Sequence, residues 1–364
     1  MKQRIFSILL FILTFSICIA QKTAANNMEV IAYYAGSSEA IDQFNVEQLT
    51  QIIFSFSHLK GNRLHIGSAR DTARIQKLIS LKKRNAKLKV LLSLGGWGGC
   101  APCSDVFSTT EGRTEFAASV KELLQYFKAD GIDLDWEYPA IEGHPGHNYK
   151  KEDRDNFTSL VKILRTTLGK QKIISFAAGG FDEFLVESID WKAVLPVVDF
   201  VNMMTYDLVG GYSKVTGHHT SLYSTPTQNR SADNVIRYFE SINAPLKKII
   251  LGAAFYARTW EQVSNNNNGL YQSGTFRSFI SFSQFQNLLN RDSGFVYYRD
   301  PVAQAPYAYN ERTKTFATFD DEISVAAKVN YVQQKKLGGI MFWELSLDKP
   351  NNGLLQVITN SKRK

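Results

Sequence analysis

Beyond its first twenty residues, the sequence has no apolar run long enough to cross a membrane. The one long apolar run, residues 5–20, follows two basic residues and places Cys18 and Ala20 at the −3 and −1 positions of a cleavage site. This pattern is typical of a secretory signal peptide, residues 1–20. A membrane anchor is the alternative, but the run is short for a span of about 20 residues. The bulky Ile17 argues against a lipoprotein anchor at Cys18. We therefore expect a secreted protein, extracellular or periplasmic, with no stable membrane association after signal removal.

Cysteine is scarce, with three residues in 364. After the leader only Cys100 and Cys103 remain, in the stretch GGCAPCSD. Two thiols without a nearby pair of histidines do not make a four-ligand zinc site. In an exported protein we expect a local disulfide that constrains this loop. A redox-active C-x-x-C pair is the alternative, disfavoured because no thioredoxin-like context surrounds it.

The sequence also lacks a concentrated charge of either sign. The net charge of +8 is spread along the chain, and 21% of the residues are charged, as in ordinary globular proteins. We interpret the basic residues 362–364 as a solvated tail and expect no nucleic-acid partner. Because internal repeats and linkers are also missing, we expect one domain over residues 28–361, and a monomer.

Short runs rich in β-branched and aromatic residues recur along the chain and indicate eight strands. They are residues 29–35, 51–57, 88–96, 131–138, 172–178, 198–207, 248–256 and 338–345. Amphipathic helical patterns lie between several of them, which predicts a parallel sheet, and eight strands close a (β/α)8 TIM barrel. An open doubly wound sheet is the alternative, but no Gly-rich phosphate loop follows the first strand.

The segment between the seventh and eighth strands is far longer than one helix needs. It contains the polar NNNNG loop, a helix-like SFSQFQNLLN and the strand-like GFVYYRD and APYAYN. We expect a small α+β insertion over about residues 260–320.

The stretch DGIDLDWEYP, residues 130–139, alternates apolar residues with Asp133, Asp135 and Glu137. As a strand it places aliphatic side chains on one face and three carboxylates on the other. In a barrel such residues point inward, and Glu137, last on the strand beside Pro139, lies at the mouth where active sites form. Like charges this close predict at least one raised pKa, which a general acid requires.

Clustered carboxylates also bind Ca²⁺ or Mg²⁺, so a metal site is the alternative. The strand-like spacing and the aromatic residues at the other strand ends disfavour it. Flat apolar faces around a few polar groups suit a pyranose ring, and together these features predict a glycosidase. We expect no metal and no cofactor.

The stretch DGIDLDWEYP fits the signature D-x-x-D-x-D-x-E and resembles glycoside hydrolase family 18, the chitinases and their relatives. The segments SLGGW, MTYD, TGHHTSLYS, FYAR and GGIMFWEL resemble the family in the same order, from about residue 28 to residue 358. One departure is Ala257, where the family usually has Gly.

The resemblance implies a retaining mechanism in which the substrate's own 2-acetamido group is the nucleophile. Glu137 would be the general acid and base, Asp135 would orient the acetamido group, and Asp133 would support Asp135. Tyr206 would bind the acetamido oxygen and Asp207 would position the distorted sugar.

Chitin or chitooligosaccharides are the implied partner, held by further residues around the site. These would be Tyr33, Phe56, Trp97, Tyr138, Met204, Tyr256, Arg258 and Trp343, with Trp343 as the floor. A structural role is expected for Asp130, through a bond to backbone at the strand start, and His218 and His219 are expected to be structural or rim contacts.

Two other functions stay open. One is an endo-β-N-acetylglucosaminidase acting on N-glycan cores, against which the intact MTYD and the aromatic strand ends argue. The other is a non-catalytic chitin-binding lectin on the same fold, against which the complete set of carboxylates argues. The chitinase is the function that the sequence favours.

Overall fold

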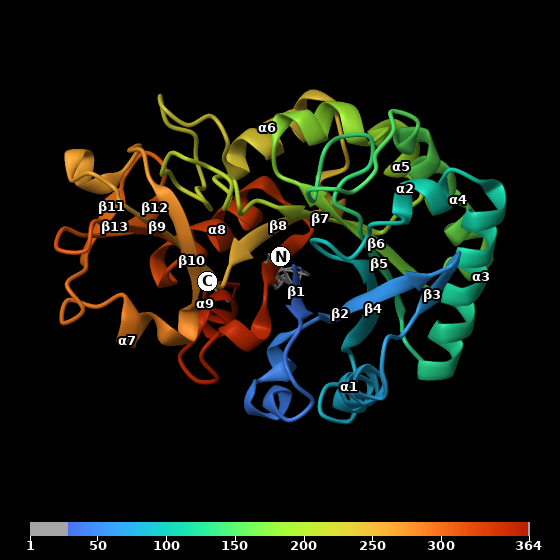
Figure 1. Cartoon of the computed structure of the whole chain (residues 1–364). Coiled ribbons are helices and arrows are strands. Elements are labelled where there is room, and N and C mark those ends of the chain that lie inside the picture. Colours follow the sequence, from blue (N-terminus) through green and yellow to red (C-terminus); the bar gives the residue numbers. More distant parts are fainter. Residues whose placement is uncertain (1–27, 363–364) are drawn as a thin grey trace, which may run out of the picture.

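The computed structural model describes residues 28–362, and its main feature is a closed parallel barrel (Figure 1). Each strand pairs with its neighbours in the order β1-β14-β8-β7-β6-β5-β4-β2, and β1 also pairs with β2, which closes the barrel. The strands are β1 (Glu29–Tyr34), β2 (Gln51–Lys60), β4 (Lys89–Gly95), β5 (Gly131–Asp135), β6 (Ile173–Gly179), β7 (Phe200–Met204), β8 (Ile249–Ala254) and β14 (Gly339–Trp343). The TIM barrel predicted from the sequence is confirmed, and the predicted leader, residues 1–20, lies outside the described residues.

Helices cover the outside of the barrel (Figure 1). They are α1 (Ala69–Ser80), α2 (Cys103–Phe107), α3 (Thr110–Phe127), α4 (Asp153–Leu168), α5 (Trp191–Val194), α6 (Ala232–Ser241), α8 (Glu322–Lys335) and α9 (Leu354–Lys362). Polar residues begin several of them: Ser231 caps α6, and Asp321 with Ser324 forms a reciprocal cap on α8. These side chains satisfy backbone N–H groups that have no partner within the helix.

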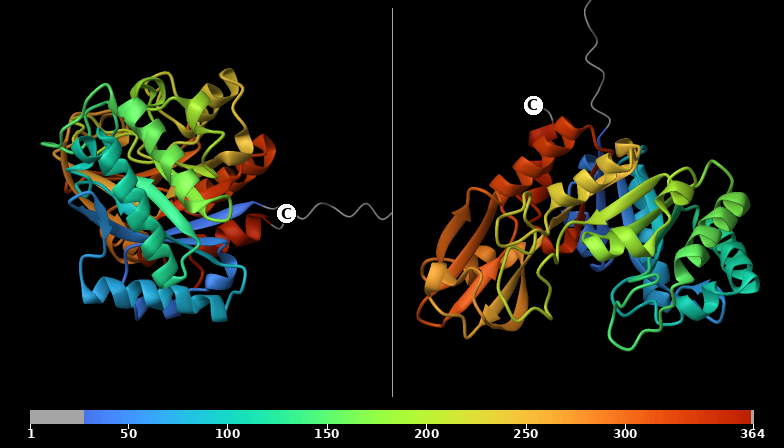
Figure 2. Two further views of the ribbon diagram at one scale, coloured as in Figure 1. Left: turned by 90° about the vertical axis from the view of Figure 1, so that its right-hand side faces the viewer. Right: turned by 90° about the horizontal axis from the view of Figure 1, so that it is seen from above.

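Between β8 and α8 the chain forms a second, five-stranded antiparallel sheet beside the barrel (Figure 2). Its strands lie in the order β10 (Thr275–Ser281), β9 (Tyr256–Glu261), β13 (Thr315–Thr318), β12 (Ala305–Asn310), β11 (Val296–Asp300), and the short α7 (Phe285–Leu288) follows β10. A short β3 (Arg63–His65) extends β2 by an antiparallel pairing. The domain limits of 28–361 and 260–320 stay predictions.

Two apolar layers follow from the alternation along the barrel strands. On β5, Ile132 and Leu134 are buried in the outer layer, between the strands and the helices. Inside the barrel, Ile31, Leu91 and Met341 belong to a separate inner cluster. Because successive residues of a strand face opposite sides, the carboxylates that alternate with Ile132 and Leu134 point into the barrel.

A buried ion pair joins α8, after the second sheet, to the barrel. Lys328 on α8 binds Asp320 at 2.6 Å, and both side chains are almost fully buried. Asp320 also accepts from the backbone N–H of Ala254 at the end of β8 and from the hydroxyl of Thr220. Burial of an ion pair is tolerated because the remaining polar positions of the carboxylate are hydrogen-bonded.

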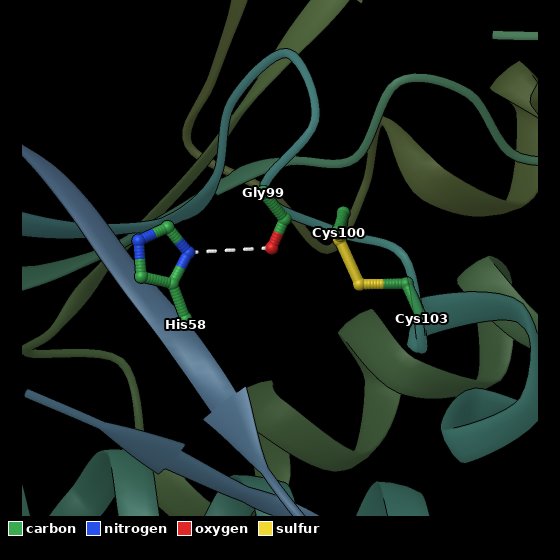
Figure 3. The surroundings of a disulfide bond; sticks show 4 residues. All are labelled: His58, Gly99, Cys100 and Cys103. Carbon is green, nitrogen blue, oxygen red and sulfur yellow. Dashed lines mark hydrogen bonds between the residues drawn. A yellow bond between two sulfur atoms is a disulfide. The ribbon is translucent and has the colours of Figure 1, made fainter. Parts of the chain in front are cut away.

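The loop after β4 carries a disulfide between Cys100 and Cys103 (Figure 3). His58 on β2 approaches this loop, with Nδ1 at 3.3 Å from the carbonyl oxygen of Gly99. Both cysteines are buried. The expected local disulfide is thus present. Within residues 28–362, no helix combines the length and apolarity that a bilayer crossing demands.

Replacing Lys328 by Met should lower the free energy of unfolding by about 3–5 kcal/mol, because the carboxylate of Asp320 would stay buried without its cation. Urea unfolding followed by circular dichroism measures this. The matched control is Lys335→Met on the same helix, whose pair with Glu240 is partly exposed and should contribute at most about 1 kcal/mol. Equal losses in the two variants would contradict the assigned role of the buried pair.

Candidate active site

The carboxylate of Asp133 lies inside the barrel and is bonded to four other strands. Its Oδ2 accepts from the hydroxyls of Tyr33 on β1 at 3.0 Å and Ser93 on β4 at 2.8 Å. Its Oδ1 accepts from the hydroxyl of Ser175 on β6 at 2.6 Å and the amide of Asn202 on β7 at 3.1 Å. Burial raises the pKa of Asp133, while these bonds act in the opposite direction.

Asp135 and Glu137 follow toward the carboxyl end of β5. Burial, with the charges of Glu137 and Asp133, raises the pKa of Asp135 well above its usual value. Within residues 28–362, the buried Oδ1 of Asp135 has no hydrogen-bond partner. Burial, with the charge of Asp207, raises the pKa of Glu137 to about 7. The raised carboxyl pKa expected from the sequence is therefore found.

One expectation about this segment is wrong. The sequence predicted a strand over 131–138 with Glu137 at its carboxyl end, but β5 ends at Asp135. Glu137 lies in the segment that follows, joined to Tyr138 by a cis peptide bond. Glu137 still points into the site because the alternation of apolar and acidic residues persists: Trp136 is buried in the outer layer. Asp130 behaves as expected, since its carboxylate accepts from the backbone N–H of Val90 at 2.8 Å.

Asp207, after β7, is held by cationic and polar groups of the second sheet. Arg258 on β9 binds both of its carboxylate oxygens, and the hydroxyl of Tyr256 donates to Oδ1 at 2.6 Å. Although partial burial acts against ionisation, the bonds from Arg258 and the proximity of His219 hold the pKa of Asp207 well below its usual range. A carboxylate that stays charged thus lies beside Glu137, whose pKa it raises.

Aromatic side chains line the rest of this end of the barrel. Trp343, at the end of β14, stacks on Phe56 with ring centroids 5.5 Å apart and lies 5.9 Å from Tyr33. Tyr206 is packed edge-on against Tyr256 at 6.3 Å. Met204, Tyr206 and Tyr256 belong to the inner apolar cluster, and Tyr138 and Trp343 pack against it. Most of the predicted site residues lie at, or shortly after, the carboxyl ends of barrel strands. Asp133 lies in the middle of β5, and Arg258 lies on β9 of the second sheet.

Trp97 lies further out, on the loop after β4, and is 47% exposed. Its ring lies 6.4 Å from Tyr138 and 6.2 Å from Tyr212, the latter on the loop after β7. The two glycines of SLGGW explain the position of this loop. Both have positive φ, and a Cβ at Gly95 would meet the carbonyl oxygen of Asp135 at 2.1 Å, while one at Gly96 would meet the ring of Phe56 at 2.4 Å.

The contact that His219 makes in the site was not predicted from the sequence. Structural or rim contacts were expected for His218 and His219, but both side chains are completely buried, so a position at the rim is excluded. His219 Nδ1 lies 3.5 Å from Asp207, and its ring packs on Tyr256 at 5.2 Å. Burial lowers the pKa of His219, which favours the neutral ring. Sequence spacing gives no sign of this contact, because residues 207 and 219 meet only through the fold of the intervening loop.

No group of three or more His, Cys, Asp or Glu side chains within residues 28–362 has the geometry to hold a metal ion. The site instead offers a proton donor with a pKa near neutrality, an unpartnered buried acceptor on Asp135, and flat apolar surfaces. This combination can bind a sugar ring and protonate a leaving oxygen.

Comparison with known proteins agrees with this geometry. The model of the family "Glycosyl hydrolases family 18" matches residues 29–348. "Chitinase A1" of Niallia circulans is 33% identical over 300 residues, which cover 76% of this chain and 43% of that protein. "Oviduct-specific glycoprotein" of Papio anubis is 29% identical over 316 residues, covering 82% of this chain and 50% of that protein. The chain thus spans half or less of the length of these two relatives.

A solved structure of a family 18 N-acetylglucosaminidase from Paenibacillus barengoltzii superposes with a TM-score of 0.84 at 33% identity. The match covers 92% of this chain and 99% of that one. The chain belongs to glycosyl hydrolases family 18.

Replacing Arg258 by Gln should raise the pKa of Asp207, because the carboxylate loses its bidentate cationic partner. Carbon-13 NMR of the labelled Asp carboxylates, followed over pH, would show the Asp207 signal titrating at higher pH than in the native protein. The control is Arg237→Gln, which removes a cation paired with Asp233 on α6. If Asp207 titrates identically in all three proteins, Arg258 does not set its ionisation.

Proposed function

We propose that this family 18 protein is a secreted chitinase that hydrolyses β-1,4 bonds between N-acetylglucosamine units with retention of configuration. The observation that carries the proposal is the position and ionisation of Glu137. A buried carboxyl with a pKa of about 7 is protonated often enough at neutral pH to act as a general acid. It lies next to a carboxylate that stays charged and within an aromatic-lined barrel mouth. Secretion is proposed from the leader-like residues 1–20.

In the proposed reaction, Glu137 donates its proton to the glycosidic oxygen as the bond to the anomeric carbon breaks. The carbonyl oxygen of the substrate's own 2-acetamido group attacks that carbon from the other face, which gives an oxazolinium ion. Glu137, now a carboxylate, then takes a proton from the water that attacks the same carbon. The oxazolinium ring opens, which restores the acetamido group. One carboxyl thus serves as acid and then as base.

The roles proposed for the remaining groups are those that the family resemblance implies, and their surroundings are compatible with them. The unpartnered Oδ1 of Asp135 is an acceptor suited to the acetamido N–H, which it would orient for attack. The charge of Asp133 would keep the pKa of Asp135 raised. The hydroxyl of Tyr206 would donate a hydrogen bond to the acetamido oxygen. Asp207, fixed by Arg258 and Tyr256, would position the distorted sugar over Trp343.

A second candidate is an N-acetylglucosaminidase that releases sugar units from a chain end. It is favoured by the structural match to the Paenibacillus barengoltzii protein of that activity. The contact of Trp97 with Tyr212 supports it as well, because loops after β4 and β7 that meet there would narrow one end of the groove. The size of the first products released from N-acetylchitohexaose separates the two: monosaccharide together with the pentasaccharide supports end-wise release, and di-, tri- and tetrasaccharides support internal cleavage.

Glu137→Gln should lower kcat on a chromogenic N-acetylchitooligosaccharide by at least about 100-fold, since an amide cannot donate the proton. Binding of the oligosaccharide, measured by calorimetry, should persist because the side chain keeps its shape. Glu142→Gln, an exposed carboxyl on the same loop, is the matched control and should keep native activity. If the native protein binds the oligosaccharide without cleaving it, a lectin replaces the chitinase as the function.

The pH profile of kcat/KM should fall on the alkaline side near pH 7, because Glu137 must be protonated in the free enzyme. Removing the negative charge of Asp207 lowers the pKa of Glu137, so Asp207→Asn should move this alkaline limb to lower pH. The position of the limb is measurable even where the variant is slow. A limb at the native pH in Asp207→Asn would show that Asp207 does not influence the proton donor.

A further inference from the structure

The second sheet carries an aromatic side chain for which the proposed function has no role. Phe279 on β10 is 62% exposed. Single exposed apolar residues are common on protein surfaces and need no explanation by themselves. The position of this ring relative to the active site is what distinguishes it from the others.

Strand pairing places Phe279 on the face of the sheet that serves the active site. In the antiparallel pairing of β10 with β9, Phe279 is opposite Arg258 and Ser281 is opposite Tyr256. Residues directly opposite in an antiparallel pair project from the same face. Phe279 therefore shares its face with Arg258 and Tyr256, the two side chains that hold Asp207.

A β-bulge is what gives Phe279 this orientation. The register shifts between Phe276, opposite Trp260, and Ser278, opposite Thr259, so that Arg277 is an extra residue on β10. Without it, residues 276 and 279 would project from opposite faces, because alternation has a period of two. With it, both rings lie on the face of Arg258. Bulges that redirect a side chain are frequent next to active sites.

The aromatic side chains on this face of the sheet are buried to different degrees along the strands. At the far end Trp260 is completely buried, its indole N–H bonded to the carbonyl oxygen of Ser213, and it packs with Leu270 and Phe316. The ring of Phe276 is only partly exposed. Its centroid lies 5.4 Å from Cζ of the Arg258 guanidinium. Phe279 is the aromatic residue of β10 that stays exposed next to the site.

We propose that Phe279 is a stacking platform for an N-acetylglucosamine unit of the bound chain that lies outside the cleavage position. This inference rests on the proposed function and extends its groove along β10. A pyranose ring presents an apolar face of C–H groups, and a flat ring exposed beside the polar groups that hold Asp207 is a suitable contact. Because the contact is remote from the bond that is cleaved, it acts on long substrates and not on those too short to reach it.

The test compares kcat/KM for N-acetylchitohexaose with kcat/KM for a chromogenic N-acetylchitobioside. In Phe279→Ala the ratio of the two should fall about three- to tenfold, the range of an aromatic contact. Phe279→Tyr keeps a flat ring and should retain the native ratio. The control is Tyr126→Ala, an aromatic of similar exposure on the outer helix α3, 69% exposed, which should also leave the ratio at its native value.

A ratio that is native in Phe279→Ala overturns the inference, as does an equal loss on both substrates, which would mean that the ring only supports Arg258. Loss of self-association in Phe279→Ala with an unchanged ratio would assign the ring to an interface between copies and would overturn the inference as well.

If the native protein cleaves neither substrate, the chitinase proposal fails. The role of Phe279 as a stacking platform is then tested by comparing the affinities of the native protein and Phe279→Ala for N-acetylchitohexaose. Weaker binding by the variant supports this role, and equal binding rejects it.

Discussion

The buried carboxylate of Asp133 is the group on which the rest of the site depends. It lies in the barrel interior, where an isolated charge would be costly, and it is tolerated because hydroxyl and amide groups from four other strands donate to it. Those donors come from β1, β4, β6 and β7, so the same bonds that satisfy Asp133 also fix β5 relative to its neighbours. The position of Asp135 and Glu137 further along the chain follows from this anchor.

The ionisation of the site divides into two regions. Along β5 and the segment directly after it, three carboxyls face inward, and burial raises the pKa of each. Across the mouth, Asp207 has Arg258, Tyr256 and His219 around it and stays charged. Environment, rather than residue type, thus assigns one carboxyl to proton donation and another to a permanent charge. The neutral form of His219 is consistent with this division, because a second cation would weaken the influence of Asp207 on Glu137.

The sequence predicted most of this arrangement, and its failures have a common physical origin. The eight strands were predictable because runs of β-branched residues are local, and the inward orientation of Asp133 was predictable from a period of two. The end of β5 was placed too late because the alternation continues through Trp136 and Glu137 after the strand pairing has stopped. The contact of His219 with Asp207, the Asp320–Lys328 pair and the bulge at Arg277 depend on how loops and neighbouring elements fold back on one another, and no periodic pattern in the sequence encodes them.

The second sheet is part of the active site because of how it is attached. On one side only Phe255 separates the end of β8 from the start of β9, so Tyr256 and Arg258 are fixed within a few residues of a barrel strand. On the other side, Asp320 follows β13 closely and is bonded to both Lys328 and the backbone of Ala254 at the end of β8. Both attachments therefore converge on the same barrel strand. A displacement of the sheet that moved Arg258 away from Asp207 would also have to break a buried ion pair. The charge of Asp207, and through it the pKa of Glu137, is consequently stabilised by contacts of Asp320 that involve none of the predicted substrate-binding residues.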